Sequence, residues 1–207
     1  YLIPLAALVF TSCGEEAYVY PDLITEMVCL KTDNQGFGTY FVTDEGRTWH
    51  LSKENQPDSL TADSTYRVVS RYVPLNETDA KAYSFYKTIS TLPKLESEYE
   101  SIHTDPVSIQ SIWRSGDYLN MVLQIMVKDQ KHELSFIENG ITTHADGTQT
   151  LTLTLYHDRK GDVEGFNEKQ YLSIPLWHYQ DILNMGDQIV LQLNTYKEGM
   201  TSRNYTY

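Results

Sequence analysis

The sequence has little cysteine, no long apolar run and few basic residues, and each shortage excludes a class of protein. Two cysteines among 207 residues are too few for the disulfide framework of a small secreted domain. No apolar run approaches the about 20 residues that a transmembrane helix needs. Lysine and arginine number 16 against 28 acidic residues, so the formal net charge is -12. An acidic protein repels phosphate groups, and we therefore expect no binding to nucleic acid.

The short motifs that mark common catalytic and metal sites are also missing. The sequence contains no Gly-x-Ser-x-Gly elbow, no His-Glu-x-x-His and no Cys-x-x-Cys, and its six histidines are dispersed. We therefore expect a protein that is not an enzyme and has no cofactor and no metal centre. A catalytic triad assembled from residues far apart in the sequence remains an alternative, because such residues need only meet in space.

One loop gathers hard oxygen ligands. Asp158, Asp162 and Glu164 lie within seven residues, with Gly161 and Gly165 available for tight turns. Their spacing suits Ca²⁺ but matches no EF-hand. We interpret this stretch as a solvated loop.

The N-terminal segment predicts export and lipid anchoring. Leu2 to Phe10 is the apolar middle of a signal peptide, so residues 1–12 are interpreted as part of that signal. The following Thr11-Ser12-Cys13-Gly14 resembles a bacterial lipobox, in which the Cys13 sulfur takes diacylglycerol. Residues 13–20 then form a lipidated tether, and its acyl chains bind the membrane.

Two further features of the N-terminal third accompany this assignment. Glu15 and Glu16 resemble the surface-export signals of some lipoproteins, although an ordinary solvated tether explains them equally well.

With Cys13 acylated, Cys29 has no disulfide partner. Because Cys29 lies in the apolar run Met27 to Leu30, we expect a buried free thiol in a strand core.

The rest of the chain predicts two all-β domains. Tyrosine is abundant at 16 residues, and short apolar runs alternate with turn residues. Five strand-like runs before residue 95 favour a small closed barrel, because closure removes sheet edges. A polar stretch at 92–100 separates the domains, so we predict a barrel at 21–95 and a β-sandwich at 103–207. The strictly alternating Thr150 to Leu155 is typical of a half-buried antiparallel strand. The runs that we expect as strands are 24–31, 39–43, 47–52, 66–73, 80–89, 107–113, 118–127, 132–137, 150–155, 171–175, 188–194 and a last one ending at 207, with a helical turn at 177–184.

Several of these segments resemble the NigD-like family of bacterial lipoproteins. The residues that carry the resemblance are Asp105-Pro106-Val107, Ile112-Trp113, Gly116-Asp117-Tyr118-Leu119-Asn120, Lys131-His132, Leu151 to His157 and Tyr171-Leu172-Ser173. The resemblance implies an N-terminal OB-like barrel followed by a C-terminal β-sandwich. The family's name comes from a bacteriocin locus, and no catalytic residues can be transferred from it. From the residues themselves, Trp113 and Tyr118 to Asn120 are interpreted as core and turn-flanking positions.

Aromatic residues of the first domain are the candidate ligand contacts. Exposed aromatic rings can serve as flat platforms for sugars, and we name Trp49, Tyr83 and Tyr86 for this role, with cross-strand packing as the alternative. An OB-like barrel can bind oligosaccharides on one face.

The polar loop before residue 65 is a candidate for covalent modification. Asp58-Ser59-Leu60 and Asp63-Ser64-Thr65 resemble acidic, hydroxyl, apolar-or-Thr triplets that receive O-linked glycans in envelope proteins. Ser59 and Ser64 are therefore predicted glycosylation sites, with ordinary turn chemistry as the alternative.

Taken together, the sequence predicts an outer-membrane lipoprotein that faces the periplasm or the cell surface. It would act as a binding or accessory module for a glycan or a protein. The alternative is a bacteriocin-immunity-like or structural envelope protein that works through protein contacts.

Overall fold

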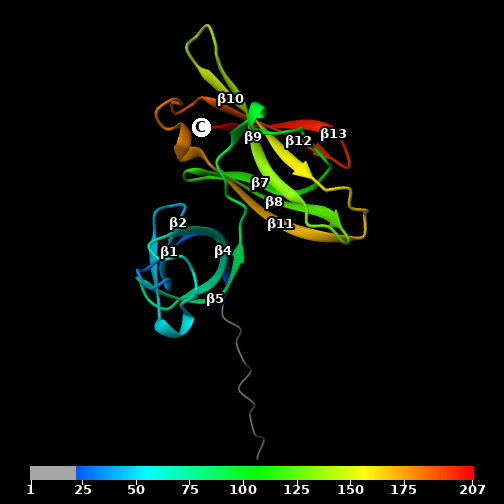
Figure 1. The fold of residues 1–207 in the computed structure, drawn as a ribbon. Helices are drawn as coiled ribbons and strands as arrows, with labels where there is room; N and C mark the ends of the chain where they lie inside the picture. Colours follow the sequence, from blue (N-terminus) through cyan, green and yellow to red (C-terminus); the bar gives the residue numbers. More distant parts are fainter. Residues whose placement is uncertain (1–21) are drawn as a thin grey trace, which may run out of the picture.

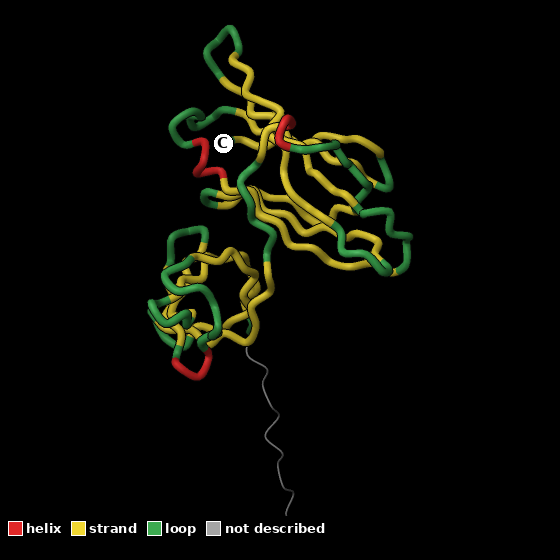
Figure 2. Tube along the Cα trace, in the orientation of Figure 1, coloured by secondary structure: helices red, strands yellow, loops and turns green. Residues whose placement is uncertain are grey.

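The computed structural model describes residues 22–207, which form two β-rich bodies (Figure 1). The predicted signal peptide, the tether and Cys13 lie outside the described residues. Strands dominate both bodies, and the helical elements are three short 3₁₀ turns (Figure 2). Within the described residues, no helix has the length and apolar character needed to cross a membrane.

Five strands close into a barrel in the first body. They follow the order β1-β2-β3-β5-β4, and β4 pairs back onto β1. The short pairing of β3 with β5 is parallel, whereas the other barrel pairs are antiparallel. The predicted small OB-like barrel is therefore confirmed. Its elements are β1 (Ile24–Thr32), β2 (Gly38–Thr43), β3 (Thr48–Leu51), η1 (Lys53–Asn55), β4 (Thr65–Pro74) and β5 (Asp79–Lys87).

Alternation along the strands fills the barrel with apolar side chains. On β3 the side chains at Trp49 and Leu51 are buried, whereas those of Thr48 and His50 are exposed. Trp49 is 2% exposed and its ring centroid lies 5.9 Å from that of Tyr72. The expectation that Trp49 faces a ligand is therefore wrong, because β2 and β5 flank its strand and its side chain points into the closed core.

The second body is a sandwich of two sheets. One sheet has the order β13-β12-β10-β9-β6 and the other β11-β8-β7. Its core is apolar and continuous, with Leu151, Leu153 and Leu155 at 2% exposure or less. The predicted β-sandwich is confirmed. Its elements are β6 (Lys94–Leu95), η2 (Glu96–Glu98), β7 (Ser108–Ser115), β8 (Tyr118–Val127), β9 (Glu133–Thr143), β10 (Gln149–Asp158), β11 (Phe166–Pro175), η3 (Leu176–Tyr179), β12 (Gln188–Thr195) and β13 (Gly199–Thr206).

The segment between the two domains belongs mainly to the sandwich. We expected the barrel to extend to residue 95, but β6 pairs in parallel with β9, at Lys94 with Ile137 and Leu95 with Glu138. Ile89 forms a parallel bridge with Leu172 of β11. The chain is thus tied to the sandwich within a few residues of the end of β5.

Candidate functional site

A groove on the outside of the barrel contains one of the predicted aromatic residues. It has a volume of about 330 Å³ and lies between the loop around η1 and strand β5. Tyr83 lines it and is 50% exposed. The lining residues are Glu54, Asn55, Gln56, Pro57, Ala82, Tyr83, Ser84 and Phe85.

A β-bulge gives Tyr83 its position. Along the β4–β5 ladder, Arg71 pairs with Ser84 and Tyr72 pairs with Ala82, so Tyr83 has no partner residue on β4. Such an extra residue bends a strand and can redirect its side chain. The Lys81 ammonium lies 5.2 Å from the Tyr83 ring centroid, which adds a cation to the platform.

Polar groups stand beside this ring. The Asn55 amide donates to Ser52 Oγ at 2.6 Å and the Gln56 amide donates to the Leu51 carbonyl at 3.2 Å. These bonds hold the two amides in place and leave their carbonyl oxygens as acceptors. Ser84 also lines the groove, and its buried Oγ has no hydrogen-bond partner among the described residues.

The Tyr83 ring and the polar groups beside it form a surface that suits a sugar. A flat ring with two fixed amides and the Glu54 carboxylate beside it can stack on the apolar face of a sugar and accept hydrogen bonds from its hydroxyls. Tyr86, by contrast, is 42% exposed and its ring centroid lies 6.2 Å from that of Tyr171 on β11. Part of the Tyr86 ring therefore serves the contact between the domains.

A buried polar cluster joins the two domains, and sequence reasoning missed it. Arg67 on β4 donates to both carboxylate oxygens of Asp44, at 2.6 and 2.8 Å. The same guanidinium donates to Asn120 Oδ1 and Ser173 Oγ on the sandwich, and Asn120 Nδ2 donates to Asp44. The side chains of Arg67 and Asp44 are only 3% and 6% exposed. Asn120, which we expected to flank a turn, is a bridge between domains.

The β7–β8 turn presses against the same cluster. Gly116 has φ +51°, and a Cβ at this position would lie 2.5 Å from the Asp44 carbonyl oxygen. A side chain there would therefore collide with the backbone that carries Asp44. Trp113, on the preceding strand, is 36% exposed and is not the core residue that we expected.

Cys29 lies at this interface and not in the barrel core. Its neighbours Val28 and Leu30 fill the core, so alternation places Cys29 on the outer face. Its Sγ lies 3.3 Å from the Tyr118 hydroxyl of the sandwich, and the residue is half-buried. The prediction of a free thiol is confirmed for the described residues, whereas the prediction of a core position is wrong.

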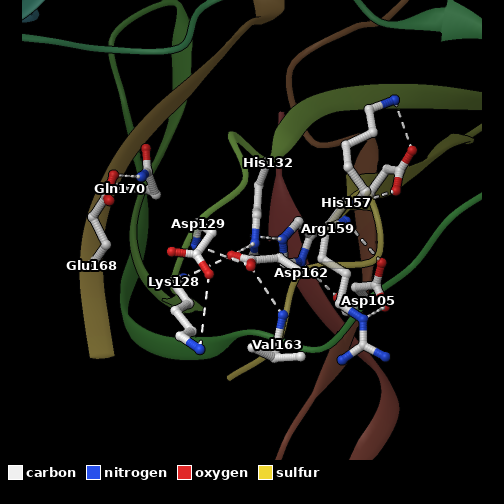
Figure 3. A network of polar contacts seen from close by, with 12 residues as sticks. Asp105, Lys128, Asp129, His132, His157, Arg159, Asp162, Val163, Glu168 and Gln170 are labelled. Atoms are coloured by element: carbon white, nitrogen blue, oxygen red, sulfur yellow. Dashed lines mark hydrogen bonds and ion pairs between the residues drawn. The ribbon is translucent and has the colours of Figure 1, made fainter. Parts of the chain in front are cut away.

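A second buried polar network occupies one end of the sandwich (Figure 3). His132 Nδ1 and His157 Nε2 are 2.9 Å apart, and His157 Nδ1 donates to the Asp105 carbonyl at 2.9 Å. His132 Nε2 lies 3.3 Å from the Asp162 carboxylate. Burial lowers the pKa of His157, so the folded protein favours its neutral form.

Asp162 anchors this network to the backbone. Its carboxylate accepts hydrogen bonds from the N–H groups of Lys128, Asp129 and Val163 at 2.7 to 3.1 Å. Burial alone would raise the pKa of Asp162, but the backbone donors of Lys128 and Asp129, together with His132, outweigh it and hold the pKa well below the usual value. Asp162 thus fastens the β8–β9 turn and has a structural role.

The acidic loop that we interpreted as solvated does not bring its three carboxylates together at one point. Asp162 turns inward as described, Glu164 is exposed, and the Asp158 carboxylate lies 2.8 Å from the Lys160 ammonium. A different group, His103, Asp105 and Asp158, brings its ligand atoms within 4.8 Å of one another. Both of its carboxylates already pair with Arg159 or Lys160. We therefore assign no ion there.

The two candidate glycosylation residues differ in access. Ser59 is exposed and lies outside any strand, with φ +58°. Ser64 is half-buried; its Oγ donates to the Ala62 carbonyl at 2.9 Å and its N–H donates to Thr32 Oγ1. A modifying enzyme would reach Ser59 more easily.

Comparison with known proteins gives one family and several similar structures. The model of the NigD-like C-terminal beta sandwich domain matches residues 90–207. A NigD-like immunity protein from Bacteroides caccae is 28% identical, with 91% of this chain and 94% of that chain covered and a TM-score of 0.71. Among curated proteins, none matches this chain.

Two more distant structures share the fold. A candidate toxin-related protein from Parabacteroides distasonis is 15% identical, with 90% of this chain and 93% of that chain covered and a TM-score of 0.67. A candidate lipoprotein from Bacteroides fragilis is 13% identical, with coverages of 90% and 97% and a TM-score of 0.60. At these identities the likeness concerns the fold alone.

Proposed function

Because the chain belongs to the NigD-like family, we propose that it is a lipid-anchored envelope protein that binds a glycan and is not an enzyme. The lipobox at Cys13 supports the anchor, and a fold relative that is a candidate lipoprotein agrees with it. The anchor would hold the protein at the outer membrane, on the periplasmic or the outer face.

The observation that carries the binding proposal is the groove at Tyr83. A half-exposed ring, two fixed amides and one carboxylate surround about 330 Å³. Glu54 is the one charged residue among the described residues that line the groove, and the Lys81 ammonium beside the Tyr83 ring supplies the opposite charge, so the balance suits a neutral sugar. Sugars are also compatible with the acidic net charge, which disfavours nucleic acid.

The Tyr83 groove can be tested on an array of bacterial and host oligosaccharides. The probe is the mature chain with Cys13→Ala, which stays soluble without its lipid. We expect binding to at least one oligosaccharide, with affinity lowered at least about tenfold by Tyr83→Ala.

The matched control is Tyr196→Ala, which removes a similarly exposed tyrosine from the sandwich, at 40% exposure. Equal losses in the two variants, or no oligosaccharide bound, would count against the groove.

An immunity-like role is the second candidate, because a family relative with 28% identity is named an immunity protein. In that role the chain would recognise a protein through its surface. Capture of one specific protein by the mature chain, unchanged by Tyr83→Ala and without oligosaccharide binding, would favour this alternative.

A separate prediction concerns the lipid and the glycan attached to the protein in the cell envelope of its host. We expect the intact mass of protein from its own host to exceed the mature polypeptide by a lipid at Cys13 and a hexose-containing glycan. Ser59→Ala should remove the glycan increment, whereas Ser64→Ala should keep it, because the Ser64 hydroxyl is internally bonded. A mass equal to lipid plus polypeptide would refute the glycosylation, and a mass without lipid would refute the anchor.

A further inference from the structure

Besides the Tyr83 groove, a hollow opens at the end of the barrel where the chain leaves β5 for the sandwich. Its volume is about 540 Å³, within the range of about 300–1,000 Å³ typical of small-molecule sites. It adjoins the Tyr83 groove, since Pro57 and Phe85 line both spaces. The lining residues are Leu30, Pro57, Leu60, Thr65, Tyr66, Arg67, Val68, Phe85, Lys87, Thr88 and Ser90.

The strand pairing explains why the barrel is open here. Strand β5 pairs with β4 only as far as Val68 with Lys87, so Thr65 to Arg67 pair with β1 alone. The side chains of Leu30 and Val68, which belong to the barrel core, therefore form the base of the hollow. Leu60 forms part of the wall, and its N–H donates to the Gly36 carbonyl at 3.2 Å.

One wall residue carries an unsatisfied hydroxyl. Thr88 is 6% exposed, and its Oγ1 has no hydrogen-bond partner among residues 22–207. A buried hydroxyl without a partner costs about 1–3 kcal/mol. A ligand with a hydrogen-bonding group at this point would remove that cost.

The charges around the hollow have one sign. Lys87 is exposed and forms no ion pair with any described residue. Arg67 is neutralised by Asp44, and none of the described residues that line the space is acidic. The Lys87 cation beside an apolar hollow favours a ligand with an anionic group, because this pairing acts at short range and opposes the repulsion from the net charge of -12.

We propose that this hollow binds an apolar carboxylate, such as a medium-length fatty acid. The apolar body lies between Leu60 and Phe85 and covers Leu30 and Val68. The carboxylate pairs with the Lys87 ammonium and accepts a hydrogen bond from the Thr88 hydroxyl. This inference is independent of the glycan groove.

Calorimetric titration of decanoate, kept below its micelle concentration, into the mature Cys13→Ala chain tests the proposal. We expect saturable one-to-one binding, with decanol binding about tenfold more weakly because it lacks the charge. Lys87→Gln should lower decanoate affinity about tenfold and remove the preference over decanol. The matched control is Lys169→Gln, which removes an exposed lysine of β11 outside the hollow and should leave affinity unchanged.

Thr88→Val separates a ligand role from a structural one. Valine has nearly the shape of threonine without the unsatisfied hydroxyl, so this variant should raise the melting temperature of the unliganded protein. It should also lower decanoate affinity about threefold to tenfold. Absence of decanoate binding, equal binding of decanoate and decanol, or an unchanged affinity in Thr88→Val would each overturn the proposal. Sugar binding at the Tyr83 groove is measured in a separate experiment. Its result neither supports nor contradicts decanoate binding in the hollow.

Discussion

Replacement of Arg67 by methionine is expected to lower the free energy of unfolding by about 3–5 kcal/mol. Arg67 and Asp44 form a buried ion pair at the junction of the barrel and the sandwich. Methionine fills much of the same space without a charge. The substitution therefore leaves the Asp44 carboxylate buried, with Asn120 Nδ2 as its remaining cross-domain donor.

The loss extends beyond Asp44, because the guanidinium also serves the sandwich. It donates to Asn120 Oδ1 at 2.9 Å and to Ser173 Oγ at 3.1 Å, and it lies 3.8 Å from the Tyr118 ring centroid. We therefore expect the barrel and the sandwich to lose part of their fixed orientation. Small-angle scattering of the variant, compared with the unaltered chain, would detect a broader distribution of shapes.

Urea unfolding gives the free energy of unfolding of four variants: Arg67→Met, Asp44→Leu, the two changes combined, and Arg71→Met. Arg71→Met is the matched control, because Arg71 lies on the same strand but is exposed, and it should change stability by about 0.5 kcal/mol or less. Combining Arg67→Met with Asp44→Leu should cost far less than the sum of the single changes, since no charge is left buried. If Arg67→Met were as stable as Arg71→Met, a stabilising role for the Arg67–Asp44 ion pair would be contradicted.

The sequence was sufficient to predict the architecture because alternation and turn residues act locally. Strand β8 begins and ends where its apolar run does, at Tyr118 and Val127. Strand β10 presents Leu151, Leu153 and Leu155 to the core, as its pattern predicts. Thr154 departs from the pattern: it is 5% exposed, and its hydroxyl donates to Asn139 at 2.7 Å. Asn139 lies at a bulge on β9, which no local signal indicates.

The sites were harder to predict because they depend on which outer faces are covered. Period-two alternation separates the two faces of a strand but does not say whether a second domain covers the outer one. Cys29 and Arg67 therefore seemed to be a core residue and an ordinary strand residue, although both face the sandwich. Tyr83 could be named as an aromatic residue, but its position depends on a bulge in the β4–β5 ladder.

Acidification below pH 6.5 is expected to destabilise the protein through His157. Burial lowers the pKa of His157 in the folded chain, whereas the unfolded chain titrates near 6.5. Between these two values the unfolded state binds a proton that the folded state does not. The contribution of His157 is therefore complete above pH 6.5 and declines as the pH falls, by at most about 1.4 kcal/mol per pH unit. Asp162, whose folded pKa is lowered from 3.8, adds a further loss only in stronger acid.

His157→Gln isolates this contribution, because glutamine keeps a donor and an acceptor but does not titrate. The groups that act on His157 include His132, the carbonyl and the carboxylate of Asp105 and the nearby Asp158 carboxylate, and all remain in this variant. Urea unfolding from about pH 8 to about pH 5 should therefore give a shallower decline in stability for His157→Gln, whatever its absolute stability. His144→Gln removes an exposed histidine of the β9–β10 loop and should keep the full slope. Equal slopes in the two variants would mean that the loss of stability in acid originates outside the buried histidine pair.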